Sequence, residues 1–258
     1  HDLEEEEEDE NPNLLKNGKK VYTQAIDYDL ETLNNKIENG KINPNPDFQR
    51  RYVWDNKKAS RLIESFLLDI PIPLVYLSEE DDNSLSVIDG QQRLISINKF
   101  LRNDLKLSLG RKNPLTGKRF KDLDEKLQNK IINSGLRGMI IKKESDPEIK
   151  FEIFARLNRG SVQLNDAEIR NCIYRGEYNE LLIKLAQYPH FQEILNYESW
   201  NKRMIAEEMI LRFFAFFNKH YTRYKGPMRQ FLNNEMELNQ DLTRLNIGSL
   251  IESFKKSV

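Results

Sequence analysis

The segment Asp89-Gly90-Gln91-Gln92-Arg93 brings together side chains and backbone that suit a phosphate group. An apolar run before it is typical of a strand, and the apolar spacing after it predicts a helix. Gly90 has no side chain, so a ligand can approach its backbone closely. The first turn of a helix offers amide donors and a positive dipole end, and Arg93 adds a planar bidentate donor. The segment therefore predicts a phosphate site at a strand-to-helix junction.

The acid and the two amides of this segment add catalytic options. Asp89 can hold a divalent metal ion or accept a proton from water. Gln91 and Gln92 can orient a water molecule, or hold a ribose or a base edge. We therefore take Asp89, Gln91, Gln92 and Arg93 as candidate catalytic residues. The alternative is a plain helix start with polar side chains on its surface.

A second element, Phe48–Trp54, places two adjacent arginines among three aromatic residues. Arginines can clamp a phosphate, and aromatic rings can stack on a base. Together with Gly90, the candidate nucleotide-binding residues here are Gln49, Arg50, Arg51 and Trp54. Alternatively, the aromatic side chains belong to the core and the arginine stems cover them.

A third element joins the end of one helix, before Gly160, to the start of another. Its candidate nucleotide-binding residues are Arg156, Asn158 and Arg159. Glu168, Arg170 and Asn171 follow in the next helix, where they would contact nucleic acid or form a purely structural network. In the structural alternative, Glu168 pairs with Arg170 or Arg156.

The apolar patterning predicts two parts with different secondary structure. The strand-like runs are 73–77, 84–88 and 136–141. Helices begin after Asp27 or Asp29, after Asp55 and after Gly90, and a further helix is capped by Asp122. Beyond Ile141 we find only helix signals, over 147–157, 166–174, 178–188, 204–221, 235–245 and 247–254. We therefore expect an acidic flexible lead (1–20), an α+β domain (21–145) and an all-helical region (146–258). No stop signal follows the last helix, so we expect the native chain to continue past Val258.

Composition narrows the class of protein. The chain has 40 basic and 41 acidic residues, but eight acids lie in the first ten positions, leaving 33 acids against 40 bases, or about +7. The chain after residue 10 thus has a net positive charge, which is compatible with a polyanionic ligand. The single cysteine, Cys172, excludes an internal disulfide and fits a reducing cytoplasm. No run is apolar enough to span a membrane, and there is no phosphate-binding loop of the P-loop type and no zinc-ligand spacing.

Three motifs in order resemble one family. They are Phe-Gln-Arg-x-Tyr-Val-Trp (48–54), Ile-Asp-Gly-Gln-Gln-Arg-Leu (88–94), and Phe-x-x-Leu-Asn-x-Gly-x-x-x-Leu-x-x-x-Glu-Ile-Arg-Asn (154–171). Their order and spacing, from about residue 27 to 178, resemble the N-terminal domain family of GmrSD restriction endonucleases.

The resemblance implies a ParB/sulfiredoxin-like α+β domain in bacterial defence against modified or phage DNA. It implies that the Asp-Gly-Gln-Gln-Arg motif binds and hydrolyses a nucleoside triphosphate. Because Asp89 can hold a divalent metal ion, we expect Mg²⁺ as the accompanying cofactor. It also implies that nuclease chemistry resides in a separate HNH-type domain or partner, so we expect no nuclease activity from this chain alone. We expect a cytoplasmic, nucleotide-binding sensor domain that gates DNA cleavage, with DNA and the nuclease as its partners. The sequence is also compatible with an oligomer. The alternative is a modified-DNA sensor without nucleotide turnover, in which Arg50, Trp54, Arg156 and Arg159 hold the DNA.

Overall fold

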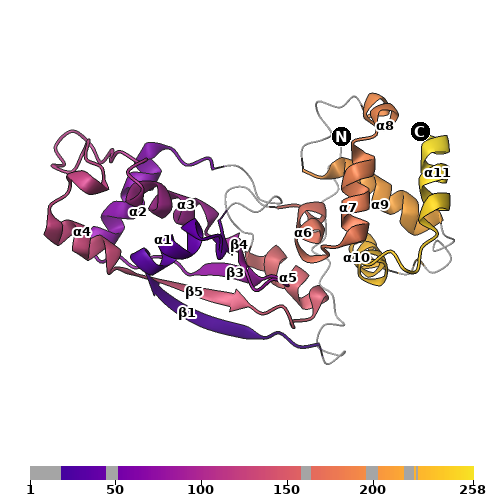
Figure 1. The fold of residues 1–258 in the computed structure, drawn as a ribbon, viewed down its shortest axis with the longest axis horizontal. Coiled ribbons are helices and arrows are strands. Elements are labelled where there is room, and N and C mark those ends of the chain that lie inside the picture. The colour runs from indigo at the N-terminus through magenta and orange to yellow at the C-terminus, as the bar shows by residue number, and fades with distance from the viewer. Residues whose placement is uncertain (1–18, 45–51, 158–163, 196–202, 218–223, 225) are drawn as a thin grey trace. The chain divides into compact units, whose positions relative to one another are not determined.

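The computed structural model describes residues 19–44, 52–157, 164–195, 203–217, 224 and 226–258. The described residues fall into two compact units (Figure 1). The first, Val21–Ser145, is called the sheet unit below. The second runs from Asp146 to Val258, is joined by Lys19 and Lys20, and is called the helical unit.

The sheet unit contains a mixed five-stranded sheet in the order β1-β5-β3-β4-β2. Its strands are β1 (Thr23–Asp29), β2 (Ile42–Asn43), β3 (Val75–Glu79), β4 (Leu85–Asp89) and β5 (Gly135–Ile141). The β1–β5 and β3–β4 pairs are antiparallel, and the β3–β5 and β2–β4 pairs are parallel. Strands β3, β4 and β5 match the three strand-like runs of the sequence. This mixed order places the C-terminal end of β4 beside the beginning of β3, where Tyr76 pairs with Asp89.

Four helices of the sheet unit pack their apolar residues into one core with the sheet. They are α1 (Leu30–Glu38), α2 (Asn56–Leu67), α3 (Gln91–Leu101) and α4 (Glu125–Ile132), with a short 3₁₀ turn, η1, at Phe120–Asp122. The core includes Leu33, Ile63, Leu77 and Ile97, which are all fully or almost fully buried. Figure 1 shows the four helices gathered over the sheet. This packing fixes the C-terminal end of β4 and the N-terminal end of α3, which meet in the Asp89–Arg93 segment.

Aspartates begin three of these helices. Of the two caps that the sequence allowed for α1, Asp29 and not Asp27 accepts from the amide of Thr32. Asp55 accepts from the amide of Lys58, as predicted. The prediction that Asp122 caps α4 was wrong. Asp122 instead accepts from the Arg119 amide in the η1 turn, and Asp124 caps α4.

The described residues of the helical unit form seven helices. They are α5 (Pro147–Leu157), α6 (Asp166–Ile173), α7 (Glu177–Ala186), α8 (Pro189–Ile194), α9 (Ile205–Phe217), α10 (Met228–Leu238) and α11 (Ile247–Ser257). Within the described ranges, no strand lies beyond residue 145. The α+β part and the all-helical part are therefore confirmed.

Two helix predictions in this unit need correction. The expected helix over 235–245 instead spans Met228–Leu238, and Leu242 has a left-handed φ of 58° that a continuous helix cannot contain. Helix α8 was not predicted; Pro189 fits its first turn. Cys172 is buried, as expected for a small apolar side chain. None of the helices in the described ranges is long and apolar enough to cross a membrane.

Candidate functional site

Gly90 turns the chain from β4 into α3 in a left-handed conformation, with φ of 102°. A Cβ at this position would lie 2.6 Å from Cγ1 of Val75. Gly138 on β5 is equally restricted, since a Cβ there would lie 2.9 Å from Cγ2 of the same valine. Val75, which the sequence reasoning missed, thus packs between two glycines. Glycine at position 90 is required by this packing as well as by the turn.

Asp89 and Arg93 form an ion pair across the first turn of α3, with Oδ2 and Nη2 2.7 Å apart. The other arm of Arg93, Nη1, donates to the carbonyl oxygen of Pro73. The Arg93 side chain is 12% exposed, whereas that of Asp89 is 42% exposed. Burial lowers the pKa of Arg93, and Asp89 opposes this effect, so the guanidinium remains charged at neutral pH. The pair therefore joins a fixed cation to a carboxylate that solvent reaches.

The side chains of the two glutamines of the motif mainly contact other protein groups. Gln91 is buried, and Nε2 of Gln92 donates to its side-chain oxygen at 3.1 Å. Oε1 of Gln92 accepts from the amides of Val53 and Trp54, at 2.9 and 3.1 Å. These contacts give Gln92 a structural role that the sequence did not reveal. They bring the end of the Phe48–Trp54 element onto the motif.

The same face of α3 makes two more contacts with this element. The hydroxyls of Tyr52 and Ser96 are 3.0 Å apart, and Nζ of Lys99 lies 4.0 Å from the centre of the Tyr52 ring. Trp54 is half-buried and packs against the core, as the structural alternative expects. Ser96 and Lys99 follow Gln92 by four and seven residues, a helical spacing that could have indicated them. Gln49, Arg50 and Arg51 lie outside the described residues.

The N-terminus of α3 differs from the other helix starts of the sheet unit. No side chain caps it, whereas Asp29, Asp55 and Asp124 cap α1, α2 and α4. A helix N-terminus carries partial positive charge and attracts anions. The positive end of α3 therefore lies beside the Arg93 guanidinium, and its N-cap residue, Gly90, has no side chain to accept from the first amides.

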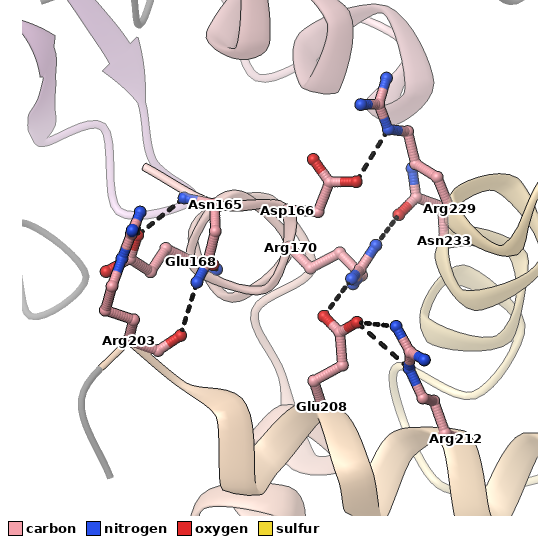
Figure 2. Close-up of polar contacts among 9 residues, drawn as sticks. All are labelled: Asn165, Asp166, Glu168, Arg170, Arg203, Glu208, Arg212, Arg229 and Asn233. Atoms are coloured by element: carbon pink, nitrogen blue, oxygen red, sulfur yellow. Dashed lines mark hydrogen bonds and ion pairs between the residues drawn. The ribbon is translucent and has the colours of Figure 1, made fainter. Parts of the chain in front are cut away.

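The third motif forms a polar network within the helical unit (Figure 2). Arg170 is 3% exposed and donates through Nη2 to Glu208 and through Nη1 to Oδ1 of Asn233, the latter at 3.2 Å. Glu168 completes a capping box with Asn165 and pairs with Arg203 at 3.2 Å. The predicted pairing of Glu168 with Arg170 or Arg156 was therefore wrong.

The other described residues of this motif each contact a different partner. Asn171 accepts from Nδ2 of Asn179 at 2.6 Å. Arg156 pairs loosely with Glu152 on its own helix, with Nε and Oε2 3.8 Å apart. Asn158 and Arg159 lie outside the described residues. The structural alternative thus describes Arg170 and Glu168 better than a ligand role does, because their charged atoms are used in joining helices.

No group of three or more His, Cys, Asp or Glu side chains within the described ranges is arranged to hold a metal ion. Asp89 is the one acidic member of the motif, so any cation here would need further ligands from a bound molecule. Mg²⁺ commonly binds in this way, through one or two carboxylates and the phosphates of a substrate.

A family model described as GmrSD restriction endonuclease, N-terminal domain, matches residues 30–175. This range covers more than half of the chain and includes all three motifs. The chain belongs to this family. A search of curated proteins finds no match. Among solved structures, the chain is similar to a Pnob8-like ParB-N domain at 12% identity and a TM-score of 0.27, covering 92% of this chain and 86% of that one.

Proposed function

We propose that the chain is a nucleotide-binding module of a restriction protein, which hydrolyses a nucleoside triphosphate and gates DNA cleavage by a separate nuclease domain. The observation that carries the proposal is the junction of β4 and α3. There an uncapped helix N-terminus lies beside the buried Arg93 guanidinium and the half-exposed carboxylate of Asp89. Membership in a restriction endonuclease family supports the wider role.

The phosphates of the nucleotide would bind at the first turn of α3. Amide donors and the helix dipole favour negative charge there, and Arg93 adds a fixed positive charge. Because Nη2 of Arg93 already donates to Asp89, a phosphate oxygen would compete with that carboxylate. Displacement would free Asp89 to act on water or to share a Mg²⁺ ion with the phosphates.

The other motif residues would act indirectly. Gln92 holds the backbone of Val53 and Trp54 against α3. The neighbouring Gln49, Arg50 and Arg51 are part of the same short element, and we propose that they contact the nucleotide. In this scheme Gln92 is a positioning residue, and Asp89 is the residue closest to the chemistry.

The test is the pair Asp89→Asn and Asp81→Asn. Asp81 is an exposed acid of the same unit, so its variant changes the net charge equally without touching the motif. We expect Asp89→Asn to reduce phosphate release from labelled triphosphates by about 100- to 1000-fold. Nucleotide affinity without Mg²⁺ should not fall, because a carboxylate that competes with phosphate has been neutralised.

Stability should change by no more than about 1 kcal/mol, because Asp89 is half-exposed and pairs near the surface. Unchanged turnover in Asp89→Asn would contradict the catalytic role. If no nucleotide binds but DNA is retained with a steep salt dependence, the chain is the alternative module, a DNA sensor without turnover.

A further inference from the structure

Strand β1 forms one edge of the five-stranded sheet, because it pairs with β5 and stands first in the strand order (Figure 1). It pairs with β5 in one register over its whole length, contains no proline, and has five exposed residues among its seven. The strand at the other edge, β2, has only two residues. An exposed and regular edge strand presents unpaired backbone groups and can accept a further strand. The β1 edge is therefore a candidate interaction surface, separate from the proposed nucleotide site at the end of β4.

The hydrogen bonds on the β5 side show which backbone groups of β1 reach the open edge. The carbonyl oxygen of Tyr22 accepts from the Lys142 amide at 2.9 Å, and the Leu30 amide donates to the Ser134 carbonyl oxygen at 3.0 Å. The even-numbered residues between them thus face β5, since the direction of both backbone groups alternates along an antiparallel strand. The odd-numbered residues inside β1, all of them exposed, direct their N–H and C=O groups to the open edge: Thr23, Ala25 and Asp27.

The outward-facing residues of β1 are arranged symmetrically about Ala25. A second copy of this edge that runs antiparallel, with Ala25 opposite Ala25, places Thr23 of each copy opposite Asp27 of the other. Each outward N–H group then meets a carbonyl oxygen, and each outward carbonyl oxygen meets an N–H group. The arrangement is closed by a two-fold axis, as in most homodimers. The edge is therefore complementary to a second copy of itself.

The side chains that meet in this register are compatible with close approach. Ala25 is small, so the two strands can come together at the axis. The Asp27 carboxylate is 60% exposed and lies 3.4 Å from Nε of Arg137 on β5. It can also accept from the hydroxyl of Thr23 on the other copy, a cross-strand contact that stabilises paired strands.

The charges along the edge favour the antiparallel direction. The exposed Lys20 precedes β1, whereas the two acids of the strand, Asp27 and Asp29, lie in its second half. An antiparallel copy sets the acidic half of one strand against the half of the other that follows the lysine. A parallel copy in register would place Asp27 beside Asp27, and like charges directly opposite each other destabilise paired strands.

We propose that two copies of this chain associate through β1, antiparallel about a two-fold axis at Ala25, so that their sheets join into one. A single pair of strands buries little surface compared with a permanent dimer. The association is therefore reversible and depends on protein concentration. It needs no nucleotide, so it stands or falls separately from the proposed hydrolysis.

Sedimentation velocity over a range of concentrations tests the dimer, and charges placed at the axis test its geometry. Ala25→Lys and Ala25→Glu should each weaken the dimer by about fivefold, because like charges meet at the axis. An equal mixture of the two variants should form a heterodimer at least as tight as the parent dimer. Gln24→Lys is the control: it adds the same charge at an exposed neighbouring position, opposite Ile26 in this register, and should weaken the dimer by less than about twofold.

Amide hydrogen exchange identifies the surface that associates. The amides of Thr23, Ala25 and Asp27 should exchange more slowly as concentration rises, whereas those of Gln24 and Ile26, which already face β5, should not change. A monomer at every concentration, a mixture of the two Ala25 variants that fails to pair, or a dimer without protection of the three outward amides would each overturn the proposal. Protection of these amides in a monomer would also overturn it, because another segment of the chain would then cover the edge.

Discussion

The sheet unit and the helical unit each contain a buried arginine paired with a carboxylate, but the two pairs differ in exposure. The carboxylate beside Arg93 is 42% exposed, whereas the Glu208 side chain beside Arg170 is 17% exposed. Arg170 also donates to Asn233, which is buried, and thereby joins three helices. A half-exposed carboxylate such as Asp89 can be replaced by a ligand at a small cost in free energy. Removing one partner of a largely buried pair such as Arg170 and Glu208 destabilises the fold much more.

The helix starts beside these arginines show the same contrast. Helix α6, which carries Arg170, begins with a full capping box made by Asn165 and Glu168. Helix α3, which carries Arg93, has no side-chain cap. Capping satisfies the first amides and stabilises a helix by roughly 1 kcal/mol. At α3 the N-cap is Gly90, which has no side chain to accept from these amides, in agreement with the proposed phosphate site.

The largest effect should follow from Arg170→Met, which removes the cation of the enclosed pair. Oε2 of Glu208 and Oδ1 of Asn233 would lose their donor, and Glu208 would keep only its bonds to Arg212, at a cost of about 3–5 kcal/mol in the free energy of unfolding. Urea unfolding of the chain measures this difference. Arg212→Ala is the control, since Arg212 bonds the same Glu208 from a half-exposed position and should cost at most about 1 kcal/mol. Equal losses in both variants would remove the distinction between enclosed and exposed pairs.

The next effect concerns Gly90, which the sheet unit needs for packing. Gly90→Ala should destabilise the chain by about 2–4 kcal/mol, because it adds strain at positive φ and a contact 2.6 Å from Val75. Gly110→Ala is a matched control, since Gly110 has a φ of 101° but no atom within 4 Å of the added Cβ. The difference between the two variants isolates the clash with Val75. If both lose the same stability, packing against Val75 does not explain the glycine.

A smaller and local effect should follow from Gln92→Leu. The amides of Val53 and Trp54 would lose their acceptor, at a cost of about 1–2 kcal/mol. Their hydrogen exchange should accelerate, while exchange in the interior of α3 should change little. Gln92→Glu keeps the accepting oxygen and should retain most of the protection. Unchanged exchange at Val53 and Trp54 would show that Gln92 does not hold this element.

Much of the fold could be predicted from local patterns. Three buried strands, the aspartate caps of α1 and α2, and the change to helices after Ile141 all follow from apolar spacing and breakers. Strand β1 could not be predicted, because most of its residues are exposed at the sheet edge and it pairs with β5, more than a hundred residues away. Pairing at such a distance has no local signal.

The strand-to-helix junction of the candidate site was predictable, but the contacts of its side chains were not. The sequence indicated the junction at Asp89–Arg93 correctly, because a strand followed by glycine and a helix is a local pattern. It could not show that Val75 packs on Gly90 or that Arg93 donates to Pro73, since these contacts depend on how β3 lies beside β4. The structural alternative likewise paired Glu168 with Arg170 or Arg156, but capping directs Glu168 toward the helix start, and Arg170 lies toward α9 and α10.

The smallest expected effect is the pH dependence of the unfolding free energy that Glu207, a buried acid of the helical unit, causes. Burial raises the pKa of Glu207 above its ordinary value of 4.5, so the folded chain binds this proton more tightly than the unfolded chain. The associated stability is fully present below about pH 4.5 and is lost as pH rises through the folded pKa. The unfolding free energy of the parent chain, relative to that of Glu207→Gln, should therefore fall as pH rises from 4.5. Glu152 and Glu237 have pKa values raised in the same direction, but both proteins contain them and they cancel in the difference. Parallel stability curves, or a difference that grows with pH, would show that Glu207 is not held in a desolvated position.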